Sequence, residues 1–352
     1  MNILKKVGLT ALGTSLVVSS AVAGELSVSG SAGYTYSTED NTGNGEAIGY
    51  NHHITFSGSG DLDNGWSVAT SMTIEPSAAL SASYVSLTMG SMGTVIVGNG
   101  YGGIGQAFDA VTPKAYEENH DGMSTSTAID NIGANMDNGQ ILYLLPSVEV
   151  GGMTVSPQFE WAPTANDAAQ YDGTASSTAS ELDSGMGVAL VASGNGLTLG
   201  AYANEIQTDS AATNKNAMAA TYYANYAAGP VTIGYQFAHQ NRGIVGAAAL
   251  STATKTVAAA TGMFESELVG IAFQVNDDVT VSYGMLDETY DSGADTTATT
   301  YDDVEMSSDS YQISYSMGSM SLAAYHTETD NVGFDKDGGS QEITEIALNF
   351  AF

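Results

Sequence analysis

The chain has 352 residues and a formal charge of −32, from 39 Asp+Glu against 7 Lys+Arg, although charged residues make up only 13% of it. The charge therefore reflects missing bases and not blocks of acids, which excludes an acidic disordered tail. A nucleic-acid partner is excluded as well, because neutralising phosphates requires many Lys and Arg. The absence of cysteine excludes disulfide scaffolds, Cys-ligated zinc and thiol catalysis.

Residues 1–23 have the pattern of a secretory signal peptide. Lys5 and Lys6 form a positive start, Val7–Val18 is a short apolar stretch, and Ala21–Ala23 is a cleavage site of small residues. The apolar stretch is too short for a membrane-spanning helix, which takes about 20 apolar residues. We therefore expect an exported protein. Cleavage removes two positive charges and no acids, so the mature chain carries a formal charge of −34.

The remainder of the chain alternates in polarity with a period of two, which is typical of β-strands. Between Leu26 and Tyr36 the even positions are apolar, aromatic or small, and Ser and Thr dominate the odd ones. Similar runs occupy residues 48–56, 66–74, 85–89, 153–161, 197–203, 231–237, 279–285, 311–317 and 346–352. Each run is about ten residues long, the length of a tilted strand that crosses a bilayer.

The connections between these runs separate a membrane barrel from a soluble sandwich. Tight turns rich in Gly, Asn and Asp are expected at residues 61–65, 90–93, 194–196, 276–278 and 318–319. Long polar loops are expected at residues 100–138, 164–185, 241–262 and 290–309. Short turns at one side and long loops at the other are typical of outer-membrane barrels, and the Ser/Thr face suits a wet lumen. We predict one all-β domain, residues 24–352: a transmembrane antiparallel β-barrel of about 16 strands, with both termini on the turn side and an aqueous channel.

Three segments resemble the Gram-negative general porins, and most closely those of alphaproteobacteria. Gly58–Trp66 looks like the first periplasmic hairpin of that family, and the terminal Phe352 resembles its assembly signal. Met92–Asn99, continuing to Gln106–Val111, is similar to the strand and loop start that precede the third loop. The resemblance implies an outer-membrane homotrimer of sixteen-stranded barrels in a Gram-negative bacterium, with lipid and lipopolysaccharide around it. It also implies that the third loop, here residues 100–138, folds into the lumen and narrows it.

The expected third loop is acidic. Its acids are Asp109, Glu117, Glu118, Asp121, Asp130 and Asp137. Rings of carboxylates in a narrow passage concentrate cations. We therefore predict a passive, cation-selective diffusion channel for ions and small hydrophilic solutes, with Asp109, Glu117, Glu118 and Asp121 at the constriction.

The sequence departs from the resemblance in its basic residues. Many general porins place a ladder of Arg and Lys opposite the third loop, but the five mature bases here all fall in expected loops. They are Lys114, Lys215, Arg242, Lys255 and Lys336. Asn99 stands where many members carry Arg, and His53 is inward by parity as a polar residue of the lumen. A transverse field of opposed charges is therefore not expected.

Other functions are less well supported by the residues. The five His, at 52, 53, 120, 239 and 326, sit in no recognisable nucleophile motif, so we expect no enzyme activity. We expect no cofactor, and at most weak Ca²⁺ or Mg²⁺ binding by acidic loops such as residues 287–291 and 302–305, which would bridge to lipopolysaccharide. Two alternatives stay open: a substrate-selective channel of the same fold, and a non-transporting, adhesin-like surface barrel.

Overall fold

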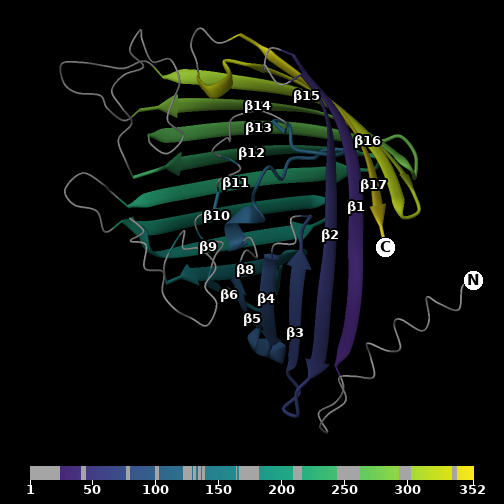
Figure 1. Ribbon diagram of the computed structural model, residues 1–352. Helices are drawn as coiled ribbons and strands as arrows, with labels where there is room; N and C mark the ends of the chain where they lie inside the picture. The colour runs from purple at the N-terminus through teal and green to yellow at the C-terminus, as the bar shows by residue number, and fades with distance from the viewer. Residues whose placement is uncertain are drawn as a thin grey trace, which may run out of the picture.

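The chain folds into one closed β-barrel (Figure 1). The computed structural model describes residues 24–40, 45–76, 80–99, 103–121, 129, 132–133, 136, 139–163, 165, 182–208, 216–243, 262–292, 303–334 and 339–352. The expected signal peptide, residues 1–23, lies outside these ranges. None of the helices within them is long and apolar enough to cross a membrane.

Seventeen strand segments build the barrel, each antiparallel to its neighbours. They are β1 (Glu25–Asp40), β2 (Gly45–Asp61), β3 (Ser67–Ile74), β4 (Leu80–Thr88), β5 (Thr94–Asn99), β6 (Gln140–Leu144), β7 (Val148–Val150), β8 (Met153–Ala162), β9 (Leu182–Gly194), β10 (Leu197–Thr208), β11 (Ala217–Ala228), β12 (Val231–Asn241), β13 (Met263–Gln274), β14 (Val279–Asp291), β15 (Val304–Met317), β16 (Met320–Asp330) and β17 (Gln341–Ala351). Short helical turns are η1 (Gly90–Met92), α2 (Gly103–Gln106) and η5 (Val332–Phe334).

β6 and β7 are two halves of one barrel strand. Both pair with β8, through Ile141–Leu144 and Val148–Val150, and the break between them contains Pro146. Proline has no backbone N–H to donate to a ladder, so regular pairing stops there. The barrel therefore has sixteen strands, and the prediction of an all-β barrel of this size is confirmed.

Pairing of the first and last strands closes the sheet. β1 lies between β2 and β17, and backbone bonds of 2.7 and 2.9 Å join Gly30 and Phe352 in both directions. Closure leaves no edge strand whose N–H and C=O groups would lack partners. Both described ends of the chain lie at the short-turn end of the barrel, as predicted (Figure 1).

The short turns form where Gly and Asn tolerate positive φ. Asn195 and Gly196 join β9 to β10 with φ values of 53° and 79°, the conformation of a type I′ hairpin turn. Gly318, with a φ of 62°, likewise joins β15 to β16, whereas residues 275–278 join β13 to β14 without a positive φ. The connections at this end have two to five residues, and most at the other end are longer; the expected sorting fails for the connections 41–44 and 75–79, which are as short as the turns.

The strand ends were predicted less well than the strands. β1 and β2 have 16 and 17 residues, well beyond the expected ten or so. The predicted bounds of the loop at residues 290–309 are wrong at both ends, because β14 runs to Asp291 and β15 begins at Val304. The acidic segment 287–291 consequently lies in a strand and not in a loop. Backbone pairing continues past the apolar belt, since carboxylates and hydroxyls at the long-loop end can face water without breaking the ladder.

The two faces of the barrel differ as the alternation predicted. The outer face carries exposed apolar and aromatic side chains, such as Ile48 at 79% exposure and Tyr50 at 66%. The inner face carries polar and small residues, such as Gln236 and Ser310, which are fully buried. The largest buried cluster lies between the inner wall and residues 104–132 of the long connection that follows β5. The core of this protein is thus a contact between loop and wall.

The closing seam provides a test of the fold. A Cβ on Gly30 would lie 2.6 Å from the Phe352 ring and 3.0 Å from the His53 carbonyl oxygen. We expect Gly30→Val to lower the free energy of unfolding by about 1–3 kcal/mol, because overpacking forces the ring aside. The midpoint of urea unfolding in detergent measures this. Ala32→Val on the same face of β1 is the control, and equal midpoints for the two variants would contradict the prediction.

Candidate functional site

The connection between β5 and β6, residues 100–139, is the third loop counted from the start of the barrel, and it folds inside. Its first described residues, in α2, contact β8, β9 and β10. Tyr116, further along, reaches β17, where its hydroxyl donates to Glu345 at 3.0 Å. The loop therefore follows the inner wall across the strands between β8 and β17, and the buried cluster that it forms with the wall also includes Ile96 of β5, with Tyr84 of β4 packed against it. The prediction that it enters the lumen is confirmed.

A row of glycines on the wall makes room for this loop. Gly234, Gly270 and Gly284 lie directly opposite one another on β12, β13 and β14. A Cβ at any of these positions would come within 3.0 Å of Pro113 or Asn119 of the loop. We call the three glycines the glycine trough. Because they have no side chains, the loop backbone packs directly against the sheet and does not stand out into the lumen.

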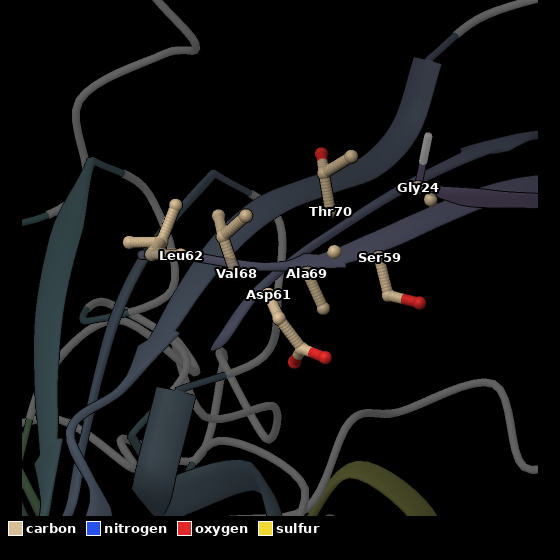
Figure 2. Close-up of a pocket in the computed structure, with 9 residues that line it drawn as sticks. Gly24, Ser59, Asp61, Leu62, Val68, Ala69 and Thr70 are labelled. Carbon is tan, nitrogen blue, oxygen red and sulfur yellow. The ribbon is translucent and has the colours of Figure 1, made fainter. Parts of the chain in front are cut away.

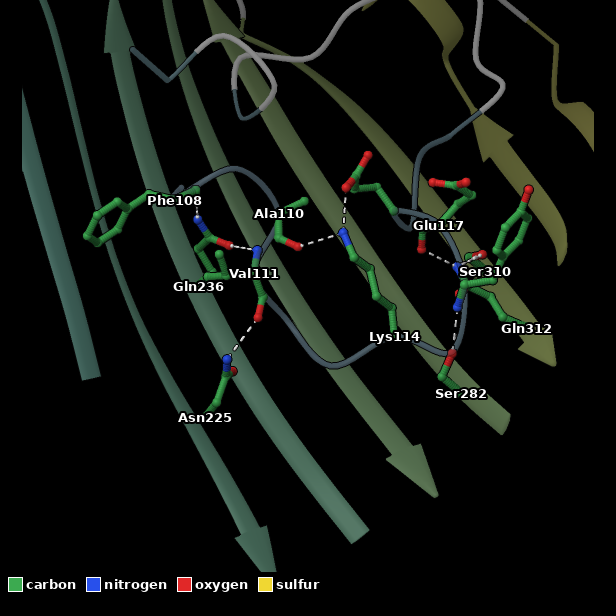
Figure 3. Close-up of polar contacts among 12 residues, drawn as sticks. Phe108, Ala110, Val111, Lys114, Glu117, Asn225, Gln236, Ser282, Ser310 and Gln312 are labelled. Atoms are coloured by element: carbon green, nitrogen blue, oxygen red, sulfur yellow. Dashed lines mark hydrogen bonds and ion pairs between the residues drawn. The ribbon is translucent and has the colours of Figure 1, made fainter. Parts of the chain in front are cut away.

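Side-chain amides of the wall bind the loop backbone next to the trough (Figure 3). Gln236 donates to the Phe108 carbonyl at 2.5 Å and accepts from the Val111 N–H at 2.8 Å. Asn225 donates to the Val111 carbonyl at 2.8 Å. These bonds satisfy backbone groups that no strand pairs with, and each is worth about 1 kcal/mol.

The same arrangement repeats three strands further on. Gln312 accepts from the Tyr116 N–H at 2.9 Å and donates to the Glu117 carbonyl at 2.7 Å (Figure 3). Ser282 accepts from the Ala115 N–H at 2.8 Å. Neutral wall side chains therefore set the position of both ends of residues 108–117.

A buried carboxylate fixes the start of the loop. Glu160 on β8 accepts from the Ile104 N–H at 2.6 Å and from the Tyr202 hydroxyl at 2.5 Å. Phe108 stacks on Tyr202, with ring centroids 5.6 Å apart. A fully buried carboxyl is costly unless it is hydrogen-bonded, and these two donors are the partners that it needs.

Residues 114–121, in the middle of the loop, bring carboxylates together with one ammonium group. Burial is the main cause that raises the pKa of Glu117 to about 6, and Asp121, Glu118 and Glu345 add to the rise through like-charge repulsion. Lys114 opposes the rise; it forms an ion pair with Glu118 and donates to the Ala110 carbonyl at 3.2 Å. The local charge is negative, because four acids surround one base.

Tyr116 completes this group. Its ring stacks on Tyr325 of β16, with centroids 6.1 Å apart. Burial and the neighbouring Glu345 and Glu117 raise the pKa of its hydroxyl, so it stays a neutral donor. The side chain therefore joins the loop to the wall without adding charge.

The wall that faces this loop is lined with hydroxyl groups. On β2 and β3, Thr55 and Thr73 share a hydrogen bond of 2.9 Å on the inner face. No Lys or Arg occurs in any described strand. Lys114 and Arg242 are the only bases among the described residues, and both lie outside strands. The third-loop side is thus acidic, whereas the strands opposite it offer hydroxyl groups and no Lys or Arg.

Comparisons with known proteins agree with this architecture. A family model described as Gram-negative porin matches residues 8–302. The chain belongs to the Gram-negative porin family. Salmonella typhi OmpF, solved with daunomycin, is similar at a TM-score of 0.67 and 13% identity, covering 94% of this chain and 98% of its own. Vibrio cholerae OmpT is similar at a TM-score of 0.62 and 10% sequence identity, and the match covers 95% of this chain and 100% of OmpT. A mutant of the Rh. blastica porin is similar at a TM-score of 0.56 and 13% sequence identity, and the match covers 93% of this chain and 100% of the mutant. A search of curated proteins finds no match.

This porin is an outer-membrane channel, and its third loop lies inside the barrel. The structure brings Glu117, Glu118 and Asp121 together, but it holds Asp109 apart from them. Residue 108 is bound by β12 and residue 117 by β15, three strands away, which corresponds to about 14 Å across a sheet. Asp130 and Asp137 lie outside the described residues.

Of the two expected lumen residues, His53 lies away from the acidic group. His53 is opposite Ser31, which is opposite Ala351, whereas Glu345 lies six residues earlier on β17. That offset places His53 about 20 Å along the wall from Glu345. Asn99 ends β5, and its side chain is outside the described part of the porin. Lys215, Lys255 and Lys336 are also outside it.

Sequence reasoning missed two acids on the wall, Glu160 and Glu345. Both occupy inward positions: Glu160 alternates with the exposed Phe159 and Trp161, and Glu345 precedes the exposed Ile346. The alternation of side chains along each strand would have been enough to place both acids in the lumen. Their contacts with the third loop could not be read from parity, because they depend on the path of the loop.

A hollow of about 280 Å³ lies on the outer face of the porin, away from the passage (Figure 2). Val68 and Thr70 line it, and they share a face of β3 with the exposed Met72. It is open because Gly58 and Gly60 on β2 have no side chains to fill it. Figure 2 shows Asp61 and Ser59 pointing to the opposite side of the sheet. The hollow takes no part in the constriction.

The glycine trough gives a test of how the passage is kept open. We expect Gly270→Leu to push the third loop from the wall into the lumen and to lower single-channel conductance to about half, because conductance follows pore width. Gly58→Leu is the matched control, since a Cβ there meets nothing closer than 3.6 Å, on the outer face. Planar-bilayer recording of both variants measures the effect. Wild-type conductance in Gly270→Leu would show that the trough does not position the loop.

Proposed function

We propose that this porin passes cations in preference to anions and acts as a passive diffusion channel for ions and small hydrophilic solutes. The observation that carries the proposal is the group of Glu117, Glu118, Asp121 and Glu345 around the single base Lys114. A low-dielectric passage with a net negative wall concentrates cations and repels anions. Asp109 lies earlier in the same loop and adds to the negative potential.

The missing basic ladder strengthens this proposal. The wall opposite the third loop offers hydroxyl groups, so an entering anion meets no cationic partner among the described strands. Hydroxyl groups hydrogen-bond equally well to water and to neutral polar solutes. The porin therefore discriminates by charge and size, and binds no one solute tightly. Solute-dependent, saturable block of conductance would instead favour a substrate-selective channel.

The assembly and processing of the chain are part of the same proposal. We infer that cleavage after Ala23 leaves a mature chain of residues 24–352, which forms a homotrimer; a structure of Vibrio cholerae OmpT is described as its trimer form. The outer face supports a contact with lipopolysaccharide through divalent cations. Its carboxylates pair across strands, with Glu267 opposite Asp287 and Glu328 opposite Glu342. Like charges directly opposite repel, and Ca²⁺ or Mg²⁺ would relieve this repulsion.

Native mass spectrometry of the porin extracted mildly from membranes checks these points together. We expect a chain mass that lacks residues 1–23, a complex of about three chains, and bound lipopolysaccharide that EDTA removes because it strips the bridging cations. A complex of one chain would contradict the trimer. Lipopolysaccharide that resists EDTA would contradict the cation bridge.

The pH dependence of selectivity tests the constriction. Because the pKa of Glu117 is raised to about 6, its carboxylate is charged above that pH and neutral below it. The preference for K⁺ over Cl⁻ should therefore fall by about twofold between pH 7 and pH 5, before acids of ordinary pKa titrate. Glu117→Gln should show the low preference at both pH values. Reversal potentials in a salt gradient measure the preference for K⁺ over Cl⁻.

The control for this experiment is Glu267→Gln, which removes one charge from the outer face of β13. It should leave the preference for K⁺ over Cl⁻ unchanged at both pH 7 and pH 5. An anion preference of the wild-type porin at pH 7 would overturn cation selectivity. A pH step that persists in Glu117→Gln would assign the titration to another group.

A further inference from the structure

The connection between β16 and β17, the eighth loop, contains three residues in the left-handed backbone conformation. Asn331, Gly333 and Phe334 have φ values of 55°, 69° and 57°. Glycine adopts this left-handed region freely and Asn tolerates it, but a bulky residue such as Phe seldom does. Such strain persists only where surrounding contacts hold the residue.

Those contacts form an aromatic cage around Phe334. Its ring centroid lies 5.5 Å from that of Phe264 and 5.9 Å from that of Tyr290, and it packs in one cluster with Val304 and Met306. Only 2% of Phe334 is exposed. The four wall residues are named the mouth cage here.

A polar contact fixes the start of the turn. Asn331 donates from its side-chain amide to the Glu305 carbonyl at 2.9 Å. The Phe334 N–H donates to the Asn331 carbonyl at 2.8 Å. The turn is therefore bound at its first residue by β15 and at its last by the mouth cage.

The mouth cage is on the inner face of the barrel. On β15, Val304 and Met306 share their face with Ser308, whose hydroxyl donates to the Asn119 carbonyl of the third loop at 3.1 Å. On β13 and β14, Phe264 and Tyr290 share the faces of the trough glycines Gly270 and Gly284. All four cage residues thus belong to the wall that the third loop follows.

The turn has to cross this inner face to reach the cage. In the sheet, β16 is next to β15, then come β14 and β13. Phe334 follows β16 but contacts Tyr290 on β14 and Phe264 on β13. Figure 1 shows the turn as a yellow coil near the long-loop ends of β14 and β15. The turn consequently lies inside the mouth and not beside it.

A second connection is held at the same cage. Arg242, which follows β12, lies with its guanidinium 5.7 Å from the Phe264 ring centroid. A cation over the face of an aromatic ring is attracted by the negative charge of that face. Phe264 is therefore a shared anchor for the eighth loop and for the connection that leaves β12.

We propose that the turn Asn331–Phe334 forms a second narrowing of the channel, at its long-loop mouth, and that Phe334 is the positioning residue that holds it there. The mouth narrowing acts on solute size, since Phe334 and its cage carry no charge. It lies in series with the acidic narrowing of the third loop, and it does not depend on cation selectivity. Release of Phe334 from the cage removes the narrowing and leaves the barrel closed.

The test compares three phenylalanine variants in planar bilayers and in liposome swelling. Phe334→Ala and Phe264→Ala should each raise single-channel conductance by about 1.5-fold and raise the swelling rate most for the largest permeant sugars, because flux follows pore width. Phe273→Ala is the matched control: it lies on the outer face of the same strand as Phe264 and should leave both readouts unchanged. The double variant Phe334→Ala/Phe264→Ala should match the single ones, because both changes release the same turn.

A protease readout separates release of the turn from a change elsewhere. Chymotrypsin cleaves after exposed aromatic residues, so the wild-type porin should resist cleavage after Phe334, and Phe264→Ala should be cut there. The masses of the fragments identify the site. Wild-type conductance in folded Phe334→Ala, or cleavage after Phe334 in the wild-type porin, would overturn the proposal. If Phe334→Ala does not fold, Phe334→Leu and Phe264→Ala replace it with the same expected direction.

Discussion

The open passage of this porin depends on how closely the third loop packs against one wall. Inside a barrel, a loop of this length has backbone groups that no strand pairs with, and they require partners. Gln236 and Gln312 supply these partners, each binding one N–H and one carbonyl of the loop. The glycine trough lets the two backbones approach closely enough for such short side chains to reach. Without both features the loop would occupy the space through which solutes pass.

Holding the loop with neutral groups has an electrostatic consequence. Where basic side chains hold or face an acidic loop, they cancel its charge, but amides and hydroxyls do not. Within the part of the chain that the structure describes, the acids around Glu117 are therefore left with Lys114 as their one close cation. Crowding and burial raise the pKa of Glu117, so the same arrangement that gives the passage its charge also makes part of that charge sensitive to pH near neutrality.

The interior of the barrel is asymmetric, because both loops that enter it pack against the same part of the wall. The third loop and the turn at Phe334 both lie on the inner face of strands between β8 and β17; on the other side β3, β4 and β5 are short, with 8, 9 and 6 residues, but β1 and β2 are the longest strands, with 16 and 17. The wall that both loops contact provides anchoring side chains at two depths, Gln312 and Ser308 for the third loop and Met306 and Val304 for the turn. The opposite wall offers hydroxyl groups such as those of Thr55 and Thr73, and its described strands contain no Lys or Arg.

The sequence by itself determined the architecture. Alternation assigned the outer face to residues such as Ile48 and the inner face to residues such as Gln236, and Asn195–Gly196 marked a hairpin, because faces and tight turns follow from the local backbone. The same local rules could not set where strands end, which is why the loop expected at 290–309 was too long. Only the tertiary structure decided that Glu345 joins Glu117, that Asp109 and His53 stay apart from them, and that three glycines on separate strands line up under one loop. Those relations depend on strand register and on the path of the loop through space, and neither is encoded in the period of any one strand.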